Sequence, residues 1–358
     1  MQANTEFFLG ANTPRGFVSF FDELYNPYKT SGAYIIKGGP GTGKSTFMKK
    51  IADRLEQKGI TTQRIYCASD PSSLDAVIAE DIDFCIADGT SPHTLEPKFP
   101  GAAENIINLG QFWDEAKLKE KREKIIALTV ENSLHHRRSA AYLSAAGSID
   151  AQTAATLEKY ISEDKIESFA VRLAHREGPH KKTGPGKMYR RFLSAITPEG
   201  TVFLDSTLKA LAYRVIALED RYSPVSRRVA MRVGEKLLKN GYDVIFCYCP
   251  LEPTQVEHII VPETGFALIS TRKEHGITAQ ADRVIHCERF MNKDFAAHRQ
   301  LLRINISLRQ NLVEEGCNML RKARQTHDIL EKEYIQAMDF ARLDEFCRET
   351  VNKITADI

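Results

Sequence analysis

The segment Gly38-Gly39-Pro40-Gly41-Thr42-Gly43-Lys44-Ser45 is a complete G-x-x-x-x-G-K-[ST] phosphate-binding loop, and it decides the fold expected for this chain. An apolar run at 33–36 precedes it, and residues 47–55 carry apolar side chains at helical spacing. Glycines allow successive backbone N–H groups to surround an anion, and the following helix points its positive end at the same place. This order of strand, loop and helix predicts an α/β domain of the P-loop NTPase type with a mostly parallel sheet and a nucleoside triphosphate as ligand.

Each position of the loop has an expected role. Lys44 is expected to reach the β- and γ-phosphates, so it is the first catalytic candidate, and the Ser45 hydroxyl is expected to bind Mg²⁺. No guanine-reading N/T-K-x-D motif follows the loop, which favours ATP over GTP. The other residues assigned to nucleotide binding are Gly38, Gly39, Pro40, Gly41, Thr42, Gly43 and Thr46.

Two aspartates follow apolar, strand-like runs. Asp88 ends the run 84–88 and is expected to support the metal as a Walker B carboxylate, with an ordinary turn-capping role as the alternative. In RecA-like ATPases the water-orienting carboxylate often ends the strand after the P-loop helix, which makes Asp70 the candidate general base. The alternative is that Asp70 caps a helix beginning at Pro71. The two aspartates could also exchange roles, because the sequence does not order the strands.

The residues after Asp88 bear on the reaction. Gly89 follows it where a glutamate would favour fast hydrolysis, so we expect a slow ATPase. Thr90 and His93 extend toward the expected γ-phosphate and are candidate contacts to it, although a lone histidine in a polar loop is usually structural.

An internal repeat is visible along the chain. Thr13-Pro14-x-Gly16 and Thr197-Pro198-x-Gly200 each stand between apolar runs and predict two β-hairpins. Residues 31–88 then align without a gap with 213–270, an offset of 182. We therefore expect a tandem duplication in which each half has an α-helical extension.

The second copy lacks the chemistry of the first. At the aligned positions Ser226 replaces Lys44, Arg227 replaces Ser45 and Ser270 replaces Asp88, while Asp220 and Val225 replace glycines. We expect no triphosphate there and one site per chain. Three arginines at the degenerate loop are candidates for an arginine finger, and the alternatives are surface charges or ion pairs with Asp220 and Glu219: Arg221, Arg227 and Arg228.

Composition and changes in the sequence pattern indicate how many domains the chain has and where they begin and end. The chain has 358 residues, 42% of them hydrophobic and 27% charged, and a net charge of +2, which predicts two soluble domains and no nucleic-acid or membrane partner. The start has no secretory pattern, and the seven cysteines form no C-x-x-C, so we expect a cytoplasmic protein with reduced thiols. The expected segments are a nucleotide-binding domain at 1–111, a helical extension at 112–178, a linker at 179–191, a degenerate P-loop-like domain at 192–290 and a second extension at 291–358.

The chain resembles a family of uncharacterised bacterial ATP-binding proteins with two tandem P-loop halves and helical extensions. The motifs that carry the resemblance are 36–46, 66–75, 86–102 and 108–114. The resemblance implies ATP binding and ATPase activity, but relatives tend to have a P-loop in the second half as well, and this sequence departs there. We expect a Mg²⁺-dependent ATPase whose helical extensions contact a protein partner; the alternatives are a small-molecule kinase and a non-hydrolysing nucleotide switch.

Overall fold

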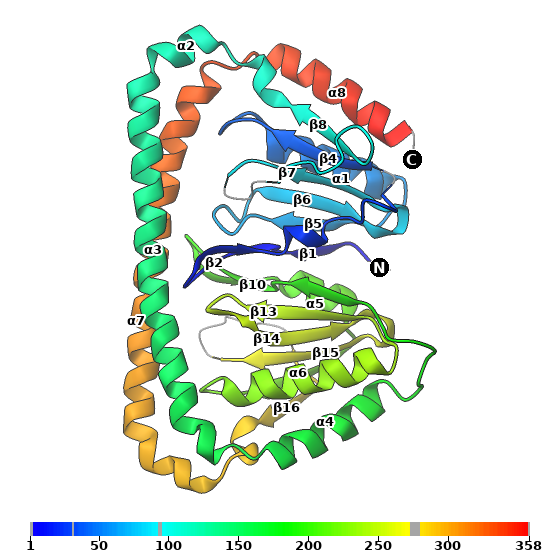
Figure 1. Cartoon of the computed structure of the whole chain (residues 1–358), viewed down its shortest axis with the longest axis vertical. Coiled ribbons are helices and arrows are strands. Elements are labelled where there is room, and N and C mark those ends of the chain that lie inside the picture. The colour runs from blue at the N-terminus through cyan, green and yellow to red at the C-terminus, as the bar shows by residue number, and fades with distance from the viewer. Residues whose placement is uncertain (1–2, 31, 92–94, 273–279, 357–358) are drawn as a thin grey trace. The chain divides into compact units, whose positions relative to one another are not determined.

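The computed structural model describes residues 3–30, 32–91, 95–272 and 280–356. The chain forms two compact α/β units (Figure 1). The first unit contains Met1–Gly10, Ser19–Arg138 and Asn318–Ile358, and the second contains Ala11–Val18 and Ser139–Cys317. The units therefore do not follow chain order, because the C-terminal segment belongs with the N-terminal sheet.

The first unit is built on a six-stranded sheet with the order β1-β5-β6-β7-β4-β8. Its neighbouring strands are parallel except that β6 runs antiparallel to β5 and β7. The strands are β1 (Thr5–Phe7), β4 (Gly32–Lys37), β5 (Gln63–Tyr66), β6 (Leu74–Ala79), β7 (Phe84–Asp88) and β8 (Glu104–Asn108).

The second unit repeats this sheet. Read from its β9 edge, the order is β9-β13-β14-β15-β12-β16, and β14 is antiparallel to both neighbours. The strands are β9 (Met188–Arg191), β12 (Arg214–Glu219), β13 (Val244–Cys249), β14 (Glu252–Val261), β15 (Phe266–Thr271) and β16 (Arg283–His286). Strand β12 stands 182 positions after β4, so the predicted mixed α/β fold in two tandem halves is confirmed, with the predicted offset.

Both predicted hairpins are present. β2 (Gly10–Thr13) and β3 (Gly16–Ser19) form one two-stranded sheet, and β10 (Ser194–Thr197) and β11 (Gly200–Phe203) form the other. In each turn the threonine hydroxyl donates to the carbonyl of the glycine three residues later. The hydroxyl also accepts from a turn N–H, which explains why the same four-residue pattern gives the same hairpin twice.

The helices that cover the first sheet come from both ends of the chain. The apolar face of α1 (Lys44–Gln57) packs on the sheet through Phe47, Met48 and Ile51, and α8 (Phe340–Ala356) joins the same core through Leu343 and Cys347. The short α2 (Glu115–Glu120) also belongs to this unit.

The second core is built in the same way from a different part of the chain. There α6 (Pro224–Lys239) packs on the sheet, and α4 (Glu163–Glu177) lies beside it with Ile166 and Leu173 buried. The first predicted extension therefore ends in α4, which packs beside α6 in the second unit. The second predicted extension ends in α8, which packs beside α1 in the first unit. The short α5 (Asp205–Leu211) completes this unit.

Two long helices contribute to both units: α3 (Arg122–Leu157) changes unit after Arg138, and α7 (Arg299–Ile335) changes unit after Cys317. Short 3-10 turns connect the main elements: η1 (Phe21–Glu23), η2 (Glu80–Ile82), η3 (Leu109–Phe112), η4 (Glu158–Tyr160), η5 (Pro262–Thr264), η7 (Cys287–Phe290) and η8 (Lys293–His298). In the described part of the chain, no helix has the length and apolar character needed to cross a membrane. All seven cysteines are free thiols, and six of them are buried.

Candidate functional site

The glycine-rich loop 38–45 connects the end of β4 to the start of α1 in the first unit. Gly41 and Gly43 have φ angles of 67° and 81°, a left-handed conformation that side chains disfavour. The Thr42 side chain is buried and its hydroxyl donates to the Gly39 carbonyl at 2.9 Å. The sequence therefore folds here into a tight turn at the N-terminus of α1, as the motif predicts.

Lys44 folds back over this turn. Its Nζ donates to the carbonyl oxygens of Gly38 at 3.0 Å and Gly39 at 2.9 Å. The same Nζ lies 3.6 Å from Asp88 Oδ2, and both side chains are largely buried. The structure thus brings together the loop lysine and the carboxylate predicted to support the metal.

Asp88 reaches this position because β7 is the direct parallel neighbour of β4, with Ile36 opposite Asp88. Its Oδ1 accepts from the Thr90 N–H at 2.8 Å and from the Thr90 hydroxyl at 2.6 Å. Thr90 thus orients the carboxylate. His93, the other residue predicted in this segment, lies outside the described residues.

Ser45 occupies the first turn of α1, and its oxygen accepts from the Leu74 N–H at 2.9 Å. This bond connects the start of α1 to the start of β6. Thr46 is exposed, whereas Pro40 is half-buried in the turn. Ser45 and Asp88 are the loop-side residues that could hold a metal, since both offer oxygen ligands.

Asp70 lies in the turn between β5 and β6 and is held by three side chains. It accepts from Ser72 Oγ at 2.7 Å, from Ser73 Oγ at 2.6 Å and from Arg324 at 2.5 Å. Burial raises the pKa of Asp70, but the serine hydrogen bonds and the Arg324 charge outweigh burial and lower it overall. The alternative prediction that Asp70 caps a helix beginning at Pro71 is wrong, because residues 71–73 form a turn that leads directly into β6.

The last turns of α7 lie against the glycine-rich loop. A Cβ added at Gly39 would stand 2.9 Å from the Tyr334 ring, which pairs with Trp113 at a centroid distance of 6.0 Å. A Cβ at Gly41 would meet Ile335 at 2.8 Å and Glu331 at 2.9 Å. The glycines are therefore needed for this helix to approach the loop as well as for the turn itself.

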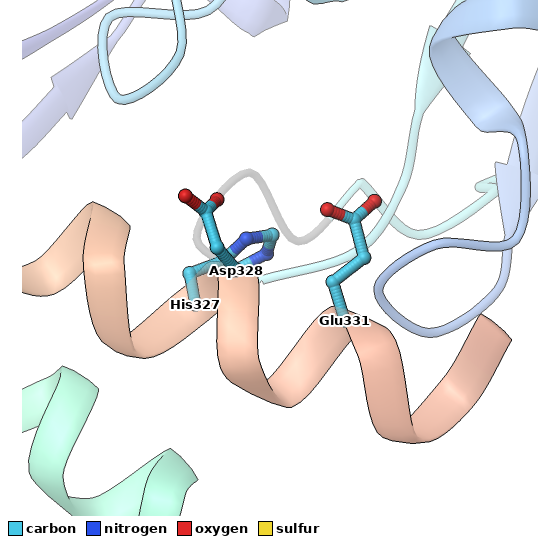
Figure 2. A group of neighbouring side chains, drawn as sticks. All are labelled: His327, Asp328 and Glu331. Carbon is cyan, nitrogen blue, oxygen red and sulfur yellow. The ribbon is translucent and has the colours of Figure 1, made fainter. Parts of the chain in front are cut away.

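The same stretch of α7 carries a small group of possible metal ligands: His327, Asp328 and Glu331, whose ligand atoms lie within 4.8 Å of one another. Figure 2 shows the Asp328 and Glu331 carboxylates projecting from the same side of the helix. Asp328 is exposed and lies 4.0 Å from Arg324. Acidic groups of this kind are common on helices without a metal, and no other contact singles this one out.

In the second unit, the loop equivalent to 38–45 has a different interior. The buried Asp220 carboxylate accepts from the N–H groups of Tyr222 at 3.1 Å and Ser226 at 2.7 Å. Ser223, aligned with Gly41, keeps a positive φ of 80° without being glycine. Ser270 Oγ donates to Ser226 Oγ at 2.7 Å, and these two serines stand at the positions of Asp88 and Lys44 in the first unit. A side-chain carboxylate thus occupies the start of α6 in this copy.

The three arginines near this second loop have local environments. Arg227 is buried and contacts Asp150 at 3.2 Å and Cys249 Sγ at 3.1 Å. Arg228 pairs with Glu158 and Glu163, and Arg221 is exposed. Arg227 and Arg228 therefore form ion pairs with Asp150, Glu158 and Glu163, so the prediction that these two arginines pair with Asp220 and Glu219 is wrong.

Sequence reasoning missed Arg324, Glu331 and Tyr334, the α7 residues that contact Asp70 or the loop. They lie more than 250 positions after Asp70, and no motif surrounds them. Searches against protein-family models, curated proteins and solved structures found no match to this chain.

Proposed function

We propose that the loop 38–45 binds the triphosphate of ATP as its Mg²⁺ complex and that the protein hydrolyses this nucleotide slowly. The observation that carries the proposal is the 3.6 Å approach of Lys44 Nζ to Asp88 Oδ2 at the ends of two adjacent parallel strands. A glycine-rich turn, a lysine for phosphate and a strand-end carboxylate for metal is the set that P-loop NTPases use. Open α/β sheets bind their ligands at this carboxyl edge.

The donor set fits a magnesium ion. The Ser45 hydroxyl and the Asp88 carboxylate would hold it, and both are the hard oxygen ligands that Mg²⁺ prefers. When bound, the ion would neutralise charge on the phosphate oxygens. Lys44 would exchange the carbonyls of Gly38 and Gly39 for phosphate oxygens, a gain because an ammonium binds an anion more strongly than a neutral acceptor.

A second candidate, a nucleotide-dependent switch with little turnover, is favoured by the environment of Asp70. Asp70 follows strand β5, which is separated from β4 by β6 and β7, and its carboxylate already accepts from Arg324 and two serines. A carboxylate held in its ionised form is a weak general base, which supports slow turnover at most. The packing of α7 on Gly39 and Gly41 gives a helix that nucleotide binding could displace.

The test is calorimetric titration of ATP, with and without Mg²⁺, into four proteins. We expect Lys44→Ala to weaken MgATP binding about 10- to 100-fold, since a hydrogen bond to a charged group contributes about 1.5–3 kcal/mol. We expect Asp88→Asn to remove most of the gain in affinity that Mg²⁺ gives. Lys50→Ala is the matched control, because Lys50 is on the same helix and its side chain is half exposed. Wild-type affinity in Lys44→Ala would contradict the proposal.

Turnover separates the two candidates. Phosphate release by the wild type that is lost in Lys44→Ala selects the ATPase. Tight MgATP binding with no release selects the switch.

A further inference from the structure

The second unit contains a cavity of about 280 Å³ at the edge of its sheet. Cys249, the last residue of β13, and Arg272, just after β15, both line it. These two strands run in the same direction, because each is antiparallel to β14. The cavity thus lies at the carboxyl edge, where α/β sheets bind ligands.

Charged side chains are buried beside this cavity. The Asp150 carboxylate lies 2.9 Å from Arg309, 3.2 Å from Arg227 and 3.9 Å from Arg272. Glu257 accepts from Arg272 at 3.1 Å. Three guanidinium groups therefore lie near two buried carboxylates at this cavity, and the Glu314 side chain in its lining is exposed.

Two residues that line the cavity each carry a buried donor atom with no partner within the described part of the chain. These atoms are Arg272 Nε and Ser194 Oγ, on side chains whose residues are 9% and 1% exposed. Buried polar groups are normally hydrogen-bonded, so two such atoms at one cavity indicate a ligand. The rest of the lining includes the apolar side chains of Ile196, Leu251 and Val313.

We propose that this cavity binds a small organic anion, with a carboxylate or phosphate group at Arg272, Arg309 and Ser194 and an apolar body along Ile196 and Val313. The paired geometry of guanidinium groups suits both kinds of oxyanion. The site is distinct from the proposed nucleotide loop, because it lies in the other unit and uses side chains rather than a glycine cradle. The backbone donors at Tyr222 and Ser226 are already bonded to Asp220, so a polyphosphate is not the expected ligand.

The test is calorimetric titration of the full chain carrying Lys44→Ala, so that weakening of the first loop leaves the second unit as the site observed. The probes are inorganic phosphate, phenyl phosphate, acetate and benzoate, with benzyl alcohol as the neutral comparison. We expect saturable 1:1 binding of phenyl phosphate or benzoate, at least about fivefold tighter than its small counterpart. Tighter binding of phenyl phosphate indicates a phosphate ligand, and tighter binding of benzoate indicates a carboxylate ligand. Absence of binding by all four anions, or equal binding of benzyl alcohol, overturns the proposal.

Variants locate the binding. Ser194→Ala removes a hydroxyl that bonds nothing in the described chain, so it should fold normally and bind the preferred probe about 3- to 10-fold more weakly. Val313→Trp should fill the cavity and abolish binding. Arg228→Gln is the control, because Arg228 pairs with Glu158 and Glu163 and does not line the cavity. Unchanged binding in both Ser194→Ala and Val313→Trp overturns the proposal, whatever the outcome of the ATP titrations.

Discussion

At the scale of single residues, the two loops differ in whether a side chain of the loop itself accepts from their backbone N–H groups. Asp220 is part of its loop and accepts from two of that loop's N–H groups, whereas Gly38 at the equivalent position leaves no side chain there. An internal carboxylate therefore takes the place that an external phosphate would need. At the aligned positions Ser226 and Arg227 replace the lysine and the serine of the first loop.

Asp150 is the carboxylate that three buried arginines share in the second unit. We expect Asp150→Asn to lower the free energy of unfolding by about 3–5 kcal/mol at pH 7, because the three guanidinium groups lose their charged partner. Burial raises the pKa of Asp150, but the charges of Arg272, Arg227 and Arg309 outweigh it and lower the pKa below its ordinary value of about 3.9. The stabilisation is therefore complete above about pH 4 and is lost as the pH falls through the folded-state pKa.

Urea unfolding of wild type and Asp150→Asn between pH 3 and 7 measures this difference. The difference in free energy of unfolding between the two proteins should become smaller toward pH 3. Asp164→Asn, at an exposed aspartate of the same unit, should change stability by less than about 1 kcal/mol. An Asp150→Asn protein as stable as wild type at pH 7 would show that the ion cluster contributes little.

At the scale of elements, the end of α7 and the glycine-rich loop form one packed assembly. Tyr334 covers Gly39, Ile335 and Glu331 cover Gly41, and Arg324 holds the Asp70 turn. One helix therefore packs on the glycine-rich loop and also holds the Asp70 turn.

Gly41→Ala tests this packing, with Gly59→Ala as a matched control. Both glycines have positive φ, 67° and 78°, so alanine is strained at each by roughly 1–2 kcal/mol. A Cβ at Gly59 meets nothing within 4 Å, whereas one at Gly41 meets Ile335 at 2.8 Å. We expect Gly41→Ala to destabilise the protein by about 1–3 kcal/mol more than Gly59→Ala in thermal or urea unfolding.

The double variant Gly41→Ala/Ile335→Ala should recover part of that excess, because it removes the nearest clashing atom. Equal destabilisation by the two glycine substitutions would mean that α7 moves away from the loop without penalty.

At the scale of the whole molecule, the two halves exchange their last helices. α4 follows the first sheet in the chain but packs beside α6 in the second unit, and α8 follows the second sheet but packs beside α1 in the first. Neither half of the sequence therefore contains a complete unit.

A chain ending at Cys317 is expected to keep the second unit and lose the first. It retains Ala11–Val18 and Ser139–Cys317 but lacks α8, whose Leu343, Cys347 and Ile354 are buried in the first core. Removal of buried apolar side chains costs about 2–5 kcal/mol each, more than a marginally stable unit can tolerate in total. Hydrogen exchange measured by mass spectrometry should show α1 amides unprotected and α6 amides protected. If the α1 amides were protected as strongly as in the full chain, the first unit would not depend on α8 and this prediction would be wrong.

Much of each half could be predicted because its signals are local. The hairpins follow from the hydrogen bonds within Thr-Pro-x-Gly, and the 182-residue offset places β12 on β4. The position of Asp88 beside Lys44 was expected from one strand and one motif. The order of the strands was not, and it separates Asp70 from the loop strand by two others.

The order of residues alone thus determined the turn at 38–45, the duplicated elements and the replacement of the loop lysine in the second copy, because each depends on neighbours within a few positions. Only the tertiary structure decided that α7 lies on Gly39 and Gly41 and that Arg324 holds Asp70. It alone gathered Asp150 and three arginines beside a cavity. These contacts join residues tens to hundreds of positions apart, and the periodicity of a long helix does not specify which of its turns will meet which loop.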